Sequence, residues 1–356
     1  MATTTSANET KKLQVTELDF DQIKTNLKNF LRNQAEFADF DFEGSGMSVL
    51  LDLLSYNTHY LGFNANMLAN EMFLDSAALR SSVVSLSKML GYTPASAIAP
   101  EADITVVLAN ASGASVTMPA GTKFTTTVGD TQYTYVTNSD KTITPQDSVY
   151  TFSNVKIYEG TRITFQYTAD SNSEDQRFIV PNSNADLTTL KVEVQNSSSD
   201  TRSFTYSKAT SLTGAASDTR VYFTQEVEDG KFEVYFGDGA VGKKIQDGNI
   251  VKLTYIVTNK TVSNGANNFS LSGTIAGFSA QSITVNSKST GGSEPESISS
   301  VKLNAPLQFS SQDRAVTAAD YKTLVKQIYP AANAIQVWGG EDNSVPQYGK
   351  VFISVK

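Results

Sequence analysis

The sequence contains no cysteine, one histidine and one tryptophan among its 356 residues. Without cysteine, disulfides, thiolate metal sites and cysteine nucleophiles are excluded. A histidine-based catalytic triad would have to use His59, the single residue of that type. No hydrophobic run reaches the ~20 residues that cross a bilayer, and the polar start MATTTSANETKK lacks the apolar core of a signal peptide. We therefore expect a soluble protein made in a cytoplasm, with no membrane segment.

Basic residues are also scarce. The formal net charge is −8, and no basic stripe is present that could neutralise the phosphates of a nucleic acid. The length allows two or three domains. We expect no nucleic-acid partner, no cofactor and no metal.

The most informative pattern lies between Met47 and Met72, where apolar residues recur at alternating spacings of four and three. This spacing is typical of a helix that packs in a coiled coil. A neighbouring helix can cover one apolar face, so the other predicts contact with another chain. Ordinary core packing is the alternative reading of such a pattern. The first stripe, our predicted helical-bundle interface, consists of Met47, Leu51, Leu54, Thr58, Leu61, Ala65, Leu68 and Met72; the second stripe consists of Leu50, Leu53, Tyr56, Tyr60, Phe63 and Met67.

Two further helices flank this one. Asp19, with Gln22 three residues later, predicts the start of a helix that continues to about Phe37. Asp75 or Ser76 is expected to cap a third helix that ends near Gly91. We predict a disordered N-terminus over residues 1–17 and a helical assembly domain over residues 18–95.

Beyond residue 95 the hydrophobic period changes from helical to two. Turn-forming Gly-Asp, Asn-Ser and Asp-Gly pairs separate the apolar segments, which predicts an antiparallel β-domain over residues 96–290. The expected strands are 104–108, 123–127, 133–137, 162–167, 190–194, 220–224, 232–236 and 251–257.

Residues 291–356 predict the start of a small α+β unit behind a flexible hinge at Gly291–Gly292. Thr317 and Asp320 form a capping box for a helix with Tyr321, Leu324, Val325 and Ile328 on one face. Strands are expected at 334–338 and 350–355. Because the chain stops directly after the second strand, we expect a truncated unit. The predicted fold class is multidomain α+β, with an N-terminal helical bundle segment, a central antiparallel β-domain and this C-terminal unit.

No catalytic constellation stands out. The segment Gly237–Lys244 resembles a phosphate-binding P-loop, but Lys244 stands where a magnesium-binding hydroxyl is needed, and turn formers follow instead of a helix. A glycine-rich turn is the better interpretation. His59 has no acidic partner on its helix face, which favours a hydrogen-bonded helix residue. The acidic pairs Glu226 with Glu228 and Asp170 with Asp175 are more typical of exposed turns than of a glycosidase.

Several long segments resemble a known family. VTMPAGTKF at 116–124, VYFGDGAVGKKIQDGNIVKLTYIVTN at 234–259, and GGSEPES with DRAVTAADYKTLV within 291–325 resemble the baseplate J-like proteins of contractile phage tails. The block FDFEGSGMSVLLDLLSYNTHYLGFNANMLANEMFLDSAALRSSVVSLSKMLGYTP resembles the baseplate wedge subunit of T-even-type phages, and EGTRITFQY with QRFIVPNSNADLTTLKVEV extends the similarity.

The resemblance implies a structural subunit without enzymatic activity or small-molecule substrate, assembled in the host cytoplasm into the virion tail baseplate. Its implied partners are other wedge proteins, through the N-terminal helices, and a second copy of itself, through the C-terminal region. Two alternatives come from the polar, acidic β-domain. A secreted adhesin or carbohydrate-binding protein would need export and has no use for the heptad helix. A glycosidase would need a carboxylate pair and an aromatic cleft, for which Trp338 is the single tryptophan.

Overall fold

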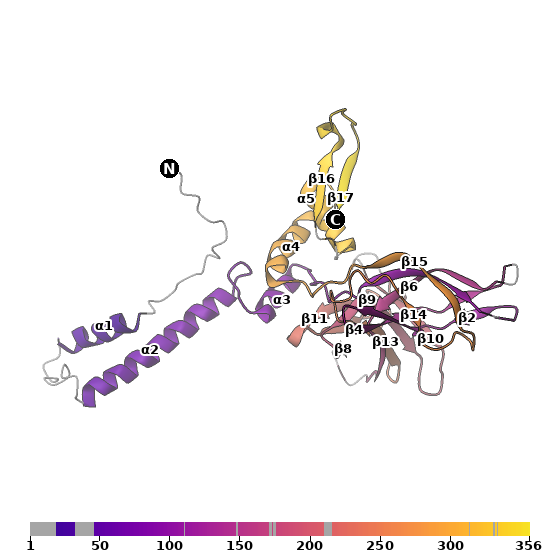
Figure 1. Cartoon of the computed structure of the whole chain (residues 1–356). Coiled ribbons are helices and arrows are strands. Elements are labelled where there is room, and N and C mark those ends of the chain that lie inside the picture. The colour runs from indigo at the N-terminus through magenta and orange to yellow at the C-terminus, as the bar shows by residue number, and fades with distance from the viewer. Residues whose placement is uncertain are drawn as a thin grey trace. The chain divides into compact units, whose positions relative to one another are not determined.

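The computed structural model describes residues 19–32, 46–109, 111–146, 149–170, 173, 176–209, 216–312, 314–329, 332 and 334–356 (Figure 1). The chain divides into two compact units, Met1–Leu90 and Gly91–Lys356. The disorder predicted for residues 1–17 concerns positions outside the described residues.

The first unit contains α1 (Phe20–Arg32), α2 (Gly46–Glu71) and α3 (Arg80–Met89). Asp19 opens α1 as predicted, because its Oδ1 accepts hydrogen bonds from the backbone N–H groups of Asp21 and Gln22. The predicted end near Phe37 lies outside the described residues. α1 packs along α2, and Lys24 forms an ion pair with Asp52 at 2.5 Å (Figure 1).

The start predicted for the third helix is wrong by about four residues. Residues after α2 form a turn in which the backbone N–H of Ala77 bonds to the carbonyl of Phe73. The Glu71 carboxylate then accepts hydrogen bonds from the N–H groups of Ala78 and Leu79. A side chain from the end of α2 thus satisfies amides that Asp75 or Ser76 was expected to cap.

The second unit contains two large sheets (Figure 1). Each encloses its own apolar core. In the first, Ile104, Val106, Phe124 and Phe152 are fully buried. Its strands, in spatial order, are β14 (Ser270–Leu271), β3 (Lys123–Val128), β4 (Thr131–Thr137), β6 (Thr151–Glu159), β1 (Glu101–Leu108) and β15 (Ala280–Thr290).

The second sheet surrounds a core that includes Val234, Val251 and Leu253. Its edge strands approach each other, since the Tyr167 hydroxyl donates to the carbonyl of Ile179 at 2.6 Å. One pair, β10 with β11, is parallel, whereas every other pairing among the described strands is antiparallel. In spatial order the strands are β7 (Thr161–Thr168), β13 (Ile250–Val257), β9 (Ala185–Gln195), β10 (Ser203–Lys208), β11 (Val221–Glu226), β12 (Phe232–Phe236) and β8 (Arg177–Val180).

Smaller elements complete this unit. The strands β2 (Val116–Met118) and β5 (Lys141–Ile143) form a separate pair, and two short 3-10 helices cover Glu228–Gly230 and Gly340–Asp342.

The chain passes from the first sheet to the second at Glu159–Gly160. Gly160 has φ of 123°, and a Cβ there would collide with the carbonyl of Val257. The Glu159 carboxylate bonds to residues that follow β13, and the fully buried Asp186 accepts the N–H of Ala99 at 2.8 Å. Single carboxylates therefore fasten the junction between the sheets.

The C-terminal part contains α4 (Ile298–Ser311), α5 (Ala318–Ile328), β16 (Ile335–Gly339) and β17 (Val351–Val355). The predicted capping box is confirmed, since Thr317 and Asp320 exchange side-chain-to-backbone hydrogen bonds. α5 packs on β16, and Val337 is buried. Ile328, however, is 82% exposed and does not share in that packing.

The expectation of a flexible hinge is wrong for Gly292. Its N–H donates to Asn264 Oδ1 at 3.0 Å, and its carbonyl accepts from Asn264 Nδ2 at 3.0 Å. A Cβ at this position would collide with the ring of Pro100 and the carbonyl of Lys260. Glycine is therefore required here for close packing, not for freedom of movement.

Candidate protein interface

α2 has an inverted pattern of burial. The residues of this helix that are buried are mostly small or polar: Ser48, Leu51, Ser55 and Asn66. They recur at spacings of three, four and eleven, which keeps them on one face. An ordinary amphipathic helix turns its large apolar side chains toward the rest of its own chain and its polar side chains toward water. Here the large apolar side chains point away from the chain's own core.

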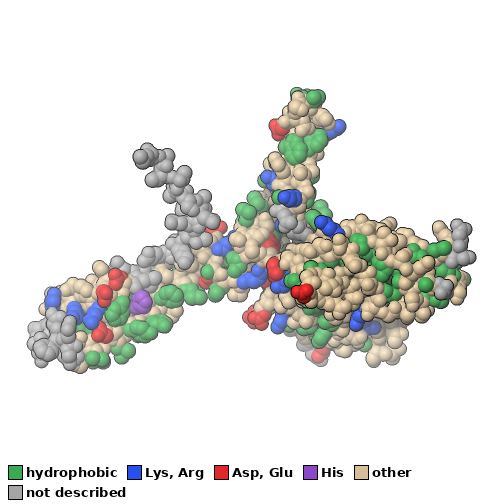
Figure 2. Space-filling model, viewed as in Figure 1, with side chains coloured by type: hydrophobic (Ala, Val, Ile, Leu, Met, Phe, Trp, Pro, Cys, Tyr) green, Lys and Arg blue, Asp and Glu red, His purple; other side chains and the backbone are tan. Residues whose placement is uncertain are grey.

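Both predicted stripes are exposed. Figure 2 shows hydrophobic side chains gathered along the surface of α2. The large side chains of the two stripes, apart from Met47 and Leu51, range from 43% exposed at Met67 to 68% at Leu68. A contiguous apolar surface of this kind on a soluble protein is typical of an interaction site. The exposed set is Leu54, Leu61, Leu68 and Met72 of the first stripe with Leu50, Leu53, Tyr56, Tyr60, Phe63 and Met67 of the second.

The remaining first-stripe residues divide into two groups. Leu51 is 3% exposed and Met47 is half-buried, so the start of the stripe is covered within the structure itself. Thr58 and Ala65 are exposed and add little bulk. The Thr58 hydroxyl donates to the carbonyl of Leu54 at 2.8 Å, so a partner helix would bury no unsatisfied polar atom there.

Residues that the hydrophobic pattern missed lie on the inward face. His59 was expected to be a hydrogen-bonded helix residue, but its Nδ1 is buried without a hydrogen-bond partner in the structure. The Ser55 hydroxyl, also on this face, is likewise buried without a hydrogen-bond partner in the structure. Regular spacing of Ser48, Ser55 and Asn66 could have signalled a helix-facing side, because small residues allow another helix to approach closely.

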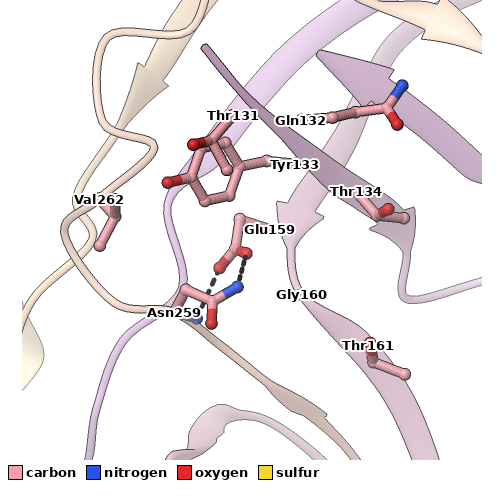
Figure 3. Close-up of a pocket in the computed structure, with 9 residues that line it drawn as sticks. All are labelled: Thr131, Gln132, Tyr133, Thr134, Glu159, Gly160, Thr161, Asn259 and Val262. Carbon is pink, nitrogen blue, oxygen red and sulfur yellow. Dashed lines mark hydrogen bonds between the residues drawn. The ribbon is translucent and has the colours of Figure 1, made fainter. Parts of the chain in front are cut away.

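A second surface feature is a polar pocket of about 450 Å³ between β4, the β6–β7 turn and residues 259–262 (Figure 3). Its one acid, Glu159, is 1% exposed. The carboxylate accepts hydrogen bonds from the Thr258 hydroxyl at 2.7 Å and from the backbone and side-chain nitrogens of Asn259 at 2.8 and 2.7 Å. Figure 3 shows it turned toward Asn259. It therefore serves the chain's own packing. The lining consists of Thr131, Gln132, Tyr133, Thr134, Glu159, Gly160, Thr161, Asn259 and Val262.

The Gly237–Lys244 segment is a compact turn, as the sequence favoured. Phosphate cradles need free backbone N–H groups, and here these groups are used internally. Asp238 Oδ1 accepts two of them at 2.9 Å, which lowers the pKa of its carboxyl. The backbone N–H groups of Ala240 and Val241 donate to the Asp238 side chain. Those of Gly239, Gly242 and Lys243 donate to the backbone carbonyls of Gly242, Ala216 and Thr219, respectively.

Metal and membrane sites were also sought in the parts of the chain that the structure describes. These parts contain no cluster of three or more acidic or histidine side chains that could hold a metal. None of their helices combines the length and apolarity needed to cross a membrane. Glu226 is 1% exposed, so it is a buried strand residue and not an exposed turn acid. Asp175 lies outside the described residues.

Comparison with known proteins gives matches over most of the chain. Residues 19–92 match the helical domain of gp6-like baseplate wedge proteins. Residues 162–267 match the third domain of the bacteriophage baseplate wedge protein gp6, and residues 317–356 match C-terminal domain I of the baseplate structural protein gp6. The baseplate wedge protein gp6 of Enterobacteria phage T4 is 30% identical over 364 residues, which cover 95% of this chain and 53% of that protein.

The chain thus spans about half the length of this curated relative. A solved structure, the 6-fold symmetrised cryo-EM structure of the anti-feeding prophage (AFP) baseplate, contains a chain that aligns with 89% of this one. The alignment covers 57% of that chain at 12% identity, and its TM-score of 0.29 is too low to support a statement about fold.

The three domain matches and the T4 relative define a structural component of a bacteriophage tail baseplate. The chain belongs to the gp6-like family of baseplate wedge proteins, and its place in the virion is the tail baseplate.

Proposed function

We propose that this protein joins wedge proteins of the baseplate through a helical bundle built on α2, and that it has no enzymatic activity. The observation that carries the proposal is the inverted pattern of α2. Its small polar residues are buried within the structure, whereas its large apolar side chains, apart from Met47 and Leu51, are exposed on both stripes. Burying these side chains in contact with other chains would remove them from water, at about 25 cal/mol per Å² of apolar surface.

The two stripes call for two partner surfaces. The first stripe has the alternating four-and-three spacing of a coiled-coil contact. The second stripe carries three aromatic side chains, and its Tyr56 and Tyr60 rings lie 5.0 Å apart between centroids. Aromatic residues are enriched at protein interfaces because their rings bury a large area and their hydroxyl can stay hydrated. The proposed partners are helices of other wedge proteins and of a second copy of this chain.

Co-purification tests the proposal directly. The double variant Leu54→Asp and Leu61→Asp places two charges on the first stripe, and burying an unpaired carboxylate in a helical bundle is strongly unfavourable. We expect the variant to lose co-purification with other wedge proteins co-expressed from the same phage. Circular dichroism of the variant should still show the β-structure of residues 102–290.

The matched control is Ser81→Asp with Ser85→Asp, which adds the same charge at exposed polar positions of α3, away from both stripes of α2. It should retain the complex. Unchanged complex formation by the Leu54/Leu61 variant would contradict the proposed bundle, and loss of the complex in both variants would point to net charge as the cause.

A further inference from the structure

Glu296, just before α4, is a meeting point of two distant segments. Its carboxylate accepts the Tyr92 hydroxyl at 2.8 Å to each oxygen and the backbone N–H of Ala95 at 3.1 Å. It also accepts the Ser300 hydroxyl at 2.6 Å and Asn304 Nδ2 at 2.9 Å, both from α4. Two donors thus come from the residues that directly follow the helical unit in the chain, and two come from α4.

Backbone hydrogen bonds hold the same two segments together. Glu296 N–H donates to the carbonyl of Ala95 at 3.0 Å. Ile98 and Ser293 exchange two further bonds, at 3.1 and 3.0 Å. Ile98 and Ser293 form an isolated antiparallel bridge, and Gly292 packs against Pro100, so these contacts join residues 92–100 to residues 291–297.

The chemistry around the carboxylate suits a lasting contact. Burial, followed by the charge and hydrogen bond of Glu296, raises the pKa of the Tyr92 phenol far above its usual range. The phenol therefore stays protonated and remains a donor at any physiological pH. Hydrogen bonds to a charged acceptor are about twice as strong as neutral ones.

We infer that Glu296 is a positioning residue that couples the segment leaving the N-terminal helical unit to α4, the helix that leads into the C-terminal α+β part. A displacement imposed on residues 92–95 reaches α4 through this carboxylate without passing through the core of either sheet. The inference rests on the proposed function, because it assigns the displacement to an N-terminal unit that binds other wedge proteins.

Hydrogen exchange on the full chain tests the coupling through cross-effects. Tyr92→Phe removes one donor and leaves α4 unaltered in sequence, yet it should speed exchange in the first turns of α4. Asn304→Ala should in turn speed exchange over residues 92–98. Glu296→Gln should speed exchange in both segments by about tenfold or more, because it weakens the charge-assisted hydrogen bonds to both of them.

The matched control is Glu294→Gln, which removes a nearby carboxylate that forms an ion pair with Lys260 at 2.6 Å and is 61% exposed. It should leave exchange in both segments unchanged. If Tyr92→Phe and Asn304→Ala each alter exchange only in their own segment, the coupling is refuted. Because the isolated chain is used, this result is independent of whether the α2 stripes bind wedge proteins.

Discussion

At the scale of single residues, two buried carboxylates join segments of the second unit that strand pairing does not connect. Glu159 and Asp186 are both buried, and each receives three hydrogen bonds from backbone, hydroxyl or amide donors. Each joins segments that belong to different parts of the β-structure. The ionised form of Asp186 loses hydration, which raises the pKa of its carboxyl. These hydrogen bonds take the place of the water molecules that an exposed carboxylate would bind.

Glu159→Gln should therefore destabilise the second unit. The amide supplies one acceptor oxygen where two are used, and its NH₂ would face the donors from Thr258 and Asn259. We expect a loss of about 1–3 kcal/mol in the free energy of unfolding, measured by urea denaturation. Glu294→Gln, which breaks the ion pair of the exposed Glu294 with Lys260 at 2.6 Å, is the control and should change little. Equal effects of the two substitutions would argue against a structural role for Glu159.

Buried tyrosines predict sensitivity to alkali. Burial raises the pKa of the Tyr222 phenol to about 12 and is the main cause that raises that of Tyr255 to about 12, against 10.0 for an exposed phenol. A raised folded-state pKa means that the fold prefers the neutral phenol, so stability is full below pH 10 and falls as the pH rises toward 12. Tyr222→Phe removes one such group and should raise the pH midpoint of unfolding, followed by circular dichroism. An unchanged midpoint would show that Tyr222 ionises without unfolding.

At the scale of elements, α2 contains both buried and exposed leucines. Leu51 is 3% exposed, whereas Leu54, three residues later, is 52% exposed. Leu51→Ala should destabilise the helical unit of the isolated chain by about 2–4 kcal/mol, because it leaves a cavity. Leu54→Ala should have little effect there and should weaken binding to wedge proteins. Thermal unfolding at 222 nm compares the two, and equal destabilisation would contradict the burial pattern.

Elements with clear local patterns could be predicted from the sequence. The capping box of Thr317 fixes the start of α5, and the eight expected strands correspond to β1, β3, β4, β7, β9, β11, β12 and β13. β6 and β15 were among the strands not predicted. In β15 polar side chains fall on both faces, as in Gln281–Ser282 and Asn286–Ser287, and in β6 the alternation is interrupted at Ser153–Asn154. Their place comes from pairing with β1, which no local pattern records.

The candidate interface could be predicted only in part. Periodicity identified the apolar stripes of α2, but it suggested that the chain's own helices would cover one of them. The buried face is instead the one with Ser48, Ser55 and Asn66, which hydrophobic patterns ignore. The prediction of a flexible hinge at Gly291–Gly292 was wrong at Gly292 for a similar reason. Two consecutive glycines indicate a free backbone, whereas the contacts of Gly292 with Pro100 and Asn264 depend on the tertiary fold.

At the scale of the whole molecule, the two compact units differ in how they bury their apolar residues. The second unit buries its apolar residues in two cores of its own. Among the residues that the structure describes, the first unit has few fully buried side chains, and it exposes the apolar surface of α2. A unit of this kind gains much of its stability from association, because most helical stability comes from packing of an apolar face. We therefore propose that the protein assembles with its partners through the first unit.

Thiol labelling of the assembled baseplate tests this central claim most directly, and the absence of cysteine makes single-site labels simple to introduce. Ala65→Cys lies on the first stripe and Met67→Cys on the second, and both positions are exposed in this chain. If other chains cover both stripes as proposed, each thiol should react readily with a maleimide in the isolated protein and become protected by at least about tenfold in the assembled particle. Equal reactivity of both thiols in the two states would contradict the account.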